Sequence, residues 1–195
     1  ALKSKLLTDY IVSTDSLDIS KIVQNYKVDV PFIRPKKYST DKASSSSALK
    51  HAVLFMEKKK NIKYDFIIEI MATNPLKNTY DIDSVIQELI RTKADSVIAM
   101  SKVTEEHPRR LKKIIKGKIV DIMYEKKESR RQDLKPEVFI RAGSIYGIRR
   151  NILIDKGLRY GTKNSRAYVL PEERSINIDS RRDFIMAEYL MKKII

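Results

Sequence analysis

The sequence predicts one α/β domain built on an open, mainly parallel β-sheet. Short apolar runs alternate along the chain with segments whose apolar residues have helical spacing, and this alternation is typical of βαβ units. The length of 195 residues is that of a single domain and is sufficient to bury a core. Ligands bind such sheets beyond the carboxyl ends of the strands, so the polar residues that follow each apolar run are candidates for a site.

The first third of the chain contains two expected strands, at 10–13 and 28–33, on either side of a helix around residues 19–23. Residues 2–7 resemble the end of an earlier helix. The run Ser44–Ser47 precedes a stripe of apolar residues with helical spacing. We therefore expect these serines to form the N-terminus of a helix, where serine is a favourable cap.

The middle of the chain contains two more expected strands, 66–71 and 96–100, connected by a helix whose expected N-cap is Asp81. Residues from about 103 to 141 are dense in Lys and Arg and interrupt the pattern, and we interpret them as an inserted lobe or arm. A strand resumes at 144–148, and the chain closes with an amphipathic helix.

The composition excludes several classes of protein. The net charge of +15 attracts anions, but the basic residues are scattered and no nucleic-acid-binding motif accompanies them, so nucleic acid is not the expected partner. Without cysteine there can be no disulfide, and His51 and His107 alone argue against a multi-histidine metal site. No apolar run approaches the roughly 20 residues that span a bilayer, and the first residues lack a secretory h-region, so a cytoplasmic protein is expected.

The strand-end residues fit a nucleotide site when they are taken together, although each alone is more typical of a turn or a helix cap. Arg34 and the Ser44–Ser47 helix start can supply the cation and the N–H groups that phosphate oxygens require. Nucleotidyl transfer also needs a hard metal ion, usually Mg²⁺, for which Asp179 is the best candidate ligand. The polar residues that follow the expected strands are Ser13, Thr14, Asp15, Arg34, Thr73, Asn74 and Asp179.

A glycine-rich phosphate loop is missing from the N-terminal half, because the first glycine of the chain is Gly117. The chain also starts without methionine, inside an expected helix. We therefore interpret residues 1–195 as one N-terminally truncated domain that lacks a leading strand and its loop.

Six short strings follow one another in a familiar order along nearly the whole chain. They are Ile11–Asp15; Arg34-Pro35 with Asp41 and Ala43–Ser45; Thr73–Lys77 leading to Asp81–Asp83; Arg130–Leu134; Gly143–Tyr146; and Ser175–Asp179. Together they resemble the acylneuraminate (CMP-sialic acid) cytidylyltransferase family. Any one string is weak, but six in order with plausible spacing are fairly specific.

The resemblance implies a Rossmann-like fold of the nucleotide-diphospho-sugar transferase type and a homodimer formed through the arm at 103–141. It implies that the enzyme joins CMP from CTP to a nonulosonic acid, an acidic nine-carbon sugar of the sialic or legionaminic type, and releases pyrophosphate with the help of Mg²⁺, for bacterial surface glycans. The implied site residues are Arg34, Ser44, Ser45 and Thr73 for the nucleotide; Met71, Arg110, Arg131 and Tyr146 for the sugar; Arg131 and Asp179 for catalysis; and Asn177 and Asp179 for the metal.

The sequence departs from the family in four places. No basic, glycine-containing phosphate motif precedes the first string. Met71 and Ala142 stand where sialate-activating members usually have Gln and Asn, and Asn177 replaces the first aspartate of the metal pair. Met71, Arg130–Leu134 and Asn177 are closer to the legionaminic-acid branch. Asn177 can still ligate Mg²⁺ through its carbonyl, with less charge.

The sequence is also compatible with two other functions. The same fold and site could serve another nucleotide-sugar transferase, such as a CMP-Kdo synthetase. A non-catalytic binding protein, either a degenerate relative of the family or a basic nucleic-acid binder, is also compatible with the charge of the chain.

Overall fold

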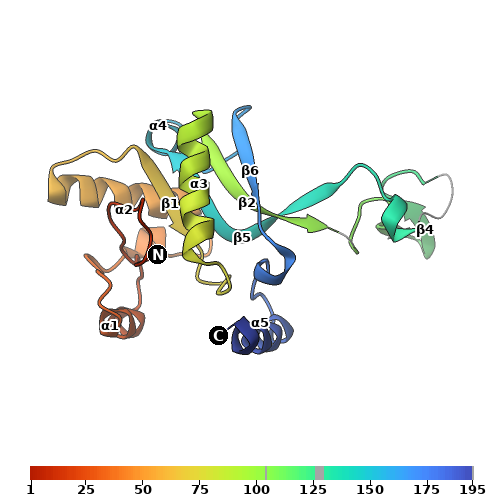
Figure 1. Cartoon of the computed structure of the whole chain (residues 1–195), viewed down its shortest axis with the longest axis horizontal. Coiled ribbons are helices and arrows are strands. Elements are labelled where there is room, and N and C mark those ends of the chain that lie inside the picture. The colour runs from red at the N-terminus through yellow and green to blue at the C-terminus, as the bar shows by residue number, and fades with distance from the viewer. Residues whose placement is uncertain (104, 126–129, 195) are drawn as a thin grey trace.

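The structure, a computed structural model, describes residues 1–103, 105–125 and 130–194 (Figure 1). Its centre is a four-stranded sheet with the order β1-β5-β2-β6. β5 is antiparallel to both of its neighbours and β6 is parallel to β2, so three strands run in one direction and β5 in the other. The predicted α/β class is confirmed. The strands are β1 (Phe66–Ile70), β2 (Ser96–Val103), β5 (Val138–Arg149) and β6 (Ser165–Val169).

Helices cover both faces of the sheet and enclose two apolar cores. α3 (Thr79–Thr92) packs on one face, while α2 (Ser45–Lys60) and α4 (Arg150–Ile154) pack on the other (Figure 1). Successive residues of a strand point to opposite faces, so Val97 lies in the first core and Ile98 in the second. Because helices cover both faces, β1 and the first half of β2 carry apolar residues on both sides.

The predicted starts of two helices can be compared with the structure. The serine run begins α2 as predicted, because Ser44 Oγ accepts a hydrogen bond from the backbone N–H of Ser47 at 3.2 Å. The prediction of Asp81 as the N-cap of α3 is wrong. Asn78 is the cap, and Asp81 completes a capping box three residues later by accepting from the Asn78 N–H at 2.8 Å.

The strands predicted at 10–13 and 28–33 are wrong, and so is the helix end at 2–7, which consists of turns and bends. The helix between them is confirmed as α1 (Leu17–Asn25). A strand forms a continuous ladder only where a neighbour pairs along its length. Residues 10–13 face a cavity on one side and meet their neighbour at isolated points on the other. These parallel bridges join Ile11 to Asp29 and Thr14 to Ile33.

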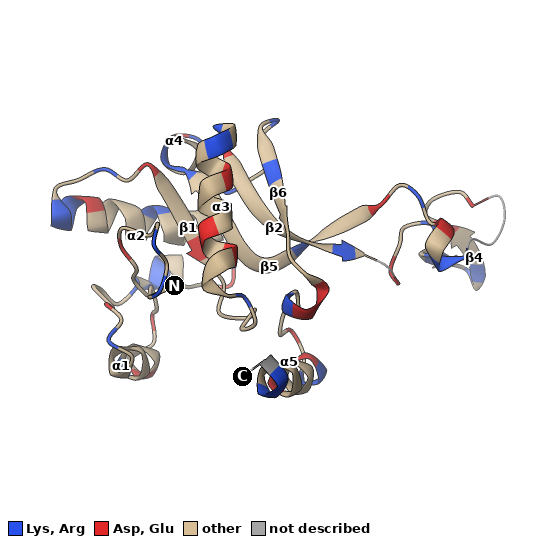
Figure 2. Ribbon diagram, in the orientation of Figure 1, with Lys and Arg blue, Asp and Glu red and all other residues tan. Residues whose placement is uncertain are grey.

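The segment at 103–141 projects from the sheet as an arm (Figure 1). The outer halves of β2 and β5 pair beyond the helical layers and lead into a hairpin of β3 (Lys112–Ile115) and β4 (Lys118–Asp121), followed by the 3₁₀ turn η2 (Arg131–Asp133). Thr104 and residues 126–129 of this segment lie outside the described residues. Figure 2 shows Lys and Arg on the arm, the helices and the loops alike, interspersed with Asp and Glu.

The C-terminal part returns below the sheet. After β6, the 3₁₀ turn η3 (Glu172–Arg174) and a loop at 175–180 lead to α5 (Arg181–Ile194), which confirms the closing helix (Figure 1). A further 3₁₀ turn, η1, spans Lys36–Tyr38. None of the helices in the described ranges combines the length and apolarity needed to cross a bilayer.

Candidate functional site

A cavity of about 1180 Å³ lies beside β1, between α2, α3 and residues 10–13. Apolar side chains of α2 and α3 form two of its walls. Polar and mixed side chains gather where it meets the carboxyl end of β1. They include Arg34, Ser45, Met71 and Lys77, of which the first three are residues that the sequence assigned to the site.

Arg34 is held in place by residues that precede and follow it in sequence. Its Nε donates to Ser39 Oγ at 3.0 Å, and its Nη2 donates to Asp15 Oδ1 at 3.1 Å. Its backbone N–H donates to the carbonyl of Thr14 at 2.7 Å. The structure therefore brings together the two predicted strand ends, 13–15 and 34. Ser44 and Ser45 are exposed at the nearby N-terminus of α2.

The loop after β1 connects Met71 and Thr73 with the C-terminal candidates. Met71 donates its N–H to the carbonyl of Ser144 at 2.8 Å, and Thr73 accepts the N–H of Ile178 at 2.8 Å. Gly143 has a φ of +58° and lies against Asn177, since a Cβ at that glycine would be 2.9 Å from Asn177 Oδ1. Residues from three distant parts of the chain thus meet at one edge of the sheet.

Asn177 and Asp179 contribute an amide and a carboxylate to this edge. The Nδ2 of Asn177 donates to Asp179 Oδ2 at 2.6 Å, and the Asp179 side chain is exposed. The Oδ1 of Asn177 is buried and has no hydrogen-bond partner among the described residues. Rotation of the amide would place that oxygen beside the carboxylate.

This donor set suits Mg²⁺, although it is not a complete metal centre. Within the described ranges, no three His, Cys, Asp or Glu side chains group together as one. Mg²⁺ usually binds one or two protein carboxylates and completes its shell with water and substrate phosphates. The carboxylate of Asp179 and the amide oxygen of Asn177 fit that requirement.

Tyr146, which the resemblance assigned to the sugar, is buried rather than open to direct contact with a ligand. It is 4% exposed, and the guanidinium of Arg159 covers its ring at 3.8 Å from the ring centre. Glu69, opposite Tyr146 in the sheet register, lies 3.1 Å from Arg159 Nε. Burial raises the pKa of Glu69 and the positive charge of Arg159 opposes that rise. Neither Glu69 Oε2 nor Arg159 Nε has a hydrogen-bond partner among the described residues, so no hydrogen bond between them offsets the effect of burial on the pKa of Glu69.

Lys77 is a site residue that the sequence analysis quoted without assigning it a role. Its Nζ donates to the backbone carbonyls of Met71 and Asn74 and lines the same cavity as Arg34. Burial lowers the pKa of Lys77 to about 8, against a smaller opposing effect of Asp81. A single lysine in a loop gives no sequence signal for such burial, because it depends on how the loop folds back under β1.

Arg110 and Arg131 lie on the arm and do not line this cavity. Both contact Glu105, at 3.1 Å from Arg110 Nη1 and 2.9 Å from Arg131 Nη1. Arg131 also lines a second cavity, of about 330 Å³, at the base of the arm together with His107, which is buried and contacts the Pro136 carbonyl at 3.0 Å. Within one chain, the structure does not bring these two arginines together with Arg34.

Comparison with known proteins identifies the family of the chain. Residues 1–168 match the cytidylyltransferase family. The pseudaminic acid cytidylyltransferase of Campylobacter jejuni is 26% identical over 194 residues, 98% of this chain and 82% of that protein. The CMP-N,N'-diacetyllegionaminic acid synthase of the same species is 26% identical over 191 residues, 98% of this chain and 80% of that protein.

The fold has a solved counterpart as well. The structure of CMP:2-keto-3-deoxy-manno-octonic acid synthetase complexed with CTP aligns with a TM-score of 0.68 at 13% identity, over 100% of this chain and 85% of that one. That similarity concerns the fold alone. The match of residues 1–168 extends over most of the chain, and it shows that this protein belongs to the cytidylyltransferase family, as the six strings predicted.

Proposed function

We propose that the protein transfers the cytidylyl group of CTP to a nonulosonic acid and releases pyrophosphate. One observation supports this most strongly. The edge at the carboxyl end of β1 joins Arg34 and Ser45 on one side with Asn177 and Asp179 on the other, through the contacts of Met71 and Thr73. A cation, a helix start and a carboxylate at one sheet edge are the groups that a nucleoside triphosphate requires.

The residues have separate roles in the proposed reaction. Arg34 and the α2 start hold the nucleotide, with Ser44, Ser45 and Thr73 as hydrogen-bonding groups. The anomeric hydroxyl of the sugar attacks the α-phosphorus, a new O–P bond forms, and the bond to the pyrophosphate oxygen breaks. Asp179 and Asn177 would hold Mg²⁺, which supplies charge to offset that developing on the phosphates. The chain needs no covalent nucleophile for this reaction.

The proposed sugar is one of the modified nonulosonic acids of bacterial surface glycans. Met71, at the cavity rim, offers a thioether where a sialate-activating site usually offers an amide, so a less hydroxylated, acylated sugar suits it better. Relatives that match almost the whole chain act on pseudaminic and diacetyllegionaminic acid according to their names. Among these sugars, we propose legionaminic acid as the substrate. A cytoplasmic location, where CTP is made available, is part of the same proposal.

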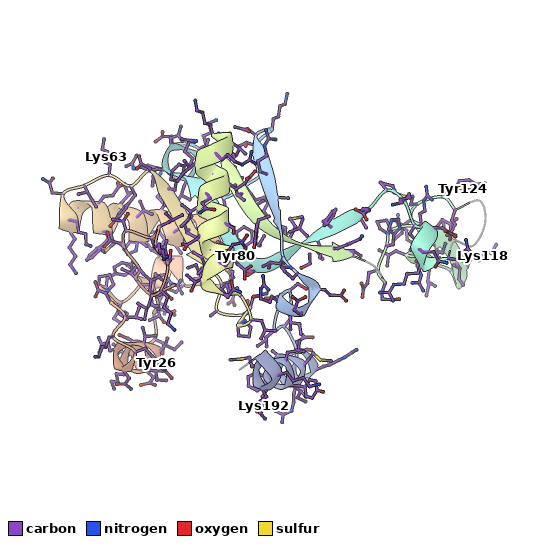
Figure 3. All side chains as sticks on the ribbon, viewed as in Figure 1. Tyr26, Lys63, Tyr80, Lys118, Tyr124 and Lys192 are labelled. Carbon is purple, nitrogen blue, oxygen red and sulfur yellow. The ribbon has the colours of Figure 1, made fainter. Side chains whose placement is uncertain are left out.

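The arm supports a homodimer as a further part of the proposal. Its hairpin exposes large apolar side chains, including Ile114 at 80% and Ile119 at 76%, and Tyr124 lies at its far end (Figure 3). Such a surface on a projecting element is typical of a protein interface. Association of two arms would also give Arg110 and Arg131 a route to the acidic sugar of the partner subunit, which they do not have within one chain.

The test is pyrophosphate release from CTP with Mg²⁺ and a panel of acidic sugars. We expect release with legionaminic, pseudaminic or sialic acid, and little with Kdo or with UTP in place of CTP. Release with Kdo alone would replace the proposed sugar and keep the fold and the nucleotide. A protein that releases pyrophosphate with none of the nine-carbon sugars would contradict the proposal.

A further inference from the structure

Arg34 lies on a turn whose own hydrogen bonds close it. The Nε of Arg34 donates to Ser39 Oγ at 3.0 Å. The N–H of Tyr38 donates to the Pro35 carbonyl at 2.9 Å, and the N–H of Ser39 donates to the Lys36 carbonyl at 3.0 Å. These bonds fix the guanidinium relative to the turn that carries it.

The turn is attached to α2 in a different way. Among the described residues, no hydrogen bond or ion pair joins residues 32–39 to α2, and the bonds that Arg34 makes outside the turn go to Thr14 and Asp15. The turn contacts the helix through aromatic rings near its two ends, Phe32 before Arg34 and Tyr38 after it. The position of Arg34 relative to the start of α2 therefore depends on how these rings pack.

His51 of α2 contacts both of these rings. The centre of its imidazole lies 4.7 Å from that of Phe32, with the ring planes at 90°, and 4.9 Å from that of Tyr38, with the planes at 38°. Phe55, one turn later on α2, contacts Phe32 at 4.7 Å. Aromatic rings attract one another at roughly 4.5–7 Å between centres, most favourably edge to face or offset. His51 thus joins both ends of the turn to the helix.

The imidazole of His51 packs as a neutral ring. Burial lowers the pKa of His51, and the positive charges of Lys37 and Arg34 lower it further. The Nδ1 of His51 is buried and has no hydrogen-bond partner among the described residues. A neutral ring can lie near Arg34 without repelling its guanidinium. The shape of the ring, rather than a charge or a hydrogen bond from Nδ1, therefore accounts for the contact.

His51 lies outside the cavity that holds the candidate site. The residues of α2 that line the cavity include Ser45, Leu49 and Val53, whereas His51 packs against the turn that carries Arg34. Ser45, at the helix start, precedes His51 by about 9 Å along the helix axis, at 1.5 Å per residue. The packing of His51 therefore sets the separation between Arg34 and Ser45, the two groups assigned to the nucleotide.

We propose that His51 is a positioning residue for the nucleotide: by packing against Phe32 and Tyr38, it holds Arg34 at the distance from the start of α2 that CTP requires. The inference rests on the proposed function, because the site concerned is the CTP site. His51 acts through Arg34 and takes no part in the chemical step.

The experiment measures the Kd for CTP with Mg²⁺ by calorimetry, and kcat and KM by pyrophosphate release. His51→Ala should raise the Kd and the KM for CTP roughly tenfold and leave kcat within about twofold, because ground-state positioning of the nucleotide is lost. His51→Phe keeps a neutral ring, so its Kd should stay within about twofold of the unmodified value.

Phe55→Ala is the matched control. It removes an aromatic ring from the same helix that contacts Phe32 and leaves the contact of His51 with Tyr38 in place. We expect its Kd for CTP to rise less than about threefold, since the turn remains attached at both ends through His51.

A double-mutant cycle tests whether His51 acts through Arg34. In an Arg34→Gln protein, His51→Ala should change the Kd for CTP by less than about twofold, because no guanidinium is left to position. If His51→Ala does not fold, Tyr38→Leu removes the same ring contact from the side of the turn and must show the same selective loss of CTP affinity.

Three outcomes would overturn this role of His51 and leave the proposed function intact. They are equal Kd values for CTP in the unmodified protein and His51→Ala, a loss that phenylalanine does not rescue, and a tenfold loss that persists in the Arg34→Gln protein. An unmodified protein that does not bind CTP would reject the proposed function and, with it, this inference.

Discussion

The guanidinium of Arg174 donates two hydrogen bonds to the carboxylate of Asp81, from Nη2 to Oδ1 at 2.9 Å and from Nε to Oδ2 at 3.1 Å. Asp81 is fully buried and also accepts from the Tyr168 hydroxyl at 2.9 Å. Arg174 in turn offers its carbonyl to Asn74 Nδ2 at 3.3 Å. This pair attaches the start of α3 to the segment that carries Asn177, so it positions the candidate metal ligands without touching them.

Replacing Arg174 by alanine is expected to destabilise the fold by about 3–5 kcal/mol, because it leaves a buried carboxylate without its cation. Unfolding in guanidinium chloride measures this loss. The neighbouring Glu173, which is 59% exposed and lies 3.6 Å from the same guanidinium, provides the control. Glu173→Ala should change the unfolding free energy by less than about 0.5 kcal/mol. Equal effects of the two substitutions would show that the buried pair does not hold the segment.

Asp179→Ala is expected to lower Mg²⁺-dependent pyrophosphate release at least roughly 100-fold while leaving the protein folded. The side chain is exposed, so its removal should change stability by less than about 0.5 kcal/mol. Asp18 is the matched control, since its side chain is 91% exposed in the first turn of α1 and does not line the cavity. Asp18→Ala should change the unfolding free energy by less than about 0.5 kcal/mol and spare turnover. An Asp179→Ala protein that unfolds with unchanged activity would make Asp179 a structural residue.

Gly143→Ala and Gly117→Ala separate backbone strain from an effect on the site. Both glycines have positive φ, +58° and +78°, so each alanine should cost about 1–2 kcal/mol. Only at Gly143 would the new Cβ displace Asn177, because no atom lies within 4 Å of the Cβ position at Gly117. We expect Gly143→Ala alone to raise the Mg²⁺ concentration needed for half-maximal turnover, by roughly tenfold. Turnover measured against Mg²⁺ concentration for both variants tests this expectation.

Arg131→Ala is expected to raise the KM for the acidic sugar, by roughly tenfold, and to change the KM for CTP much less, because a guanidinium pairs with the sugar carboxylate. Arg130 is a suitable control on the same turn, where it pairs with Asp133 at 2.7 Å. Arg130→Ala should leave both constants near the unmodified values. Equal increases for CTP and the sugar would contradict the assignment of Arg131.

The pair of Glu57 and Arg150 makes stability depend on pH. Arg150 donates to both carboxylate oxygens, at 2.6 and 2.8 Å, and this holds the pKa of Glu57 below its ordinary value of 4.5. A carboxyl with a lowered pKa stabilises the fold above the unfolded value and loses that contribution as the pH falls through the folded value. Glu57→Gln should therefore cost about 1.5–3 kcal/mol at pH 7, and the difference should narrow below about pH 4.5. Tm measured against pH for both proteins gives the result, and a difference independent of pH would exclude this linkage.

The elements with strong local patterns could be predicted from the sequence. α2 and α5 have amphipathic spacing, α2 also has a serine cap, and β1 and β2 each contain a short apolar run. The order of the six strings was enough for the family, because motif residues keep their sequence spacing whatever surrounds them. β6 was missed, since Ser165–Val169 alternates only weakly and is half-exposed at the sheet edge.

The sequence by itself determined the α/β class, most helices and the family, because these follow from periodicity and from the order of residues along the chain. Tertiary structure alone decided which candidates meet. It placed Arg34, Met71 and Lys77 around one cavity, left Arg131 on the arm, and buried Tyr146 beneath Arg159. It also decided that residues 10–13 pair only at isolated points. The physical reason is that pairing, burial and pKa depend on neighbours from distant parts of the chain, and no local pattern records which neighbours those will be.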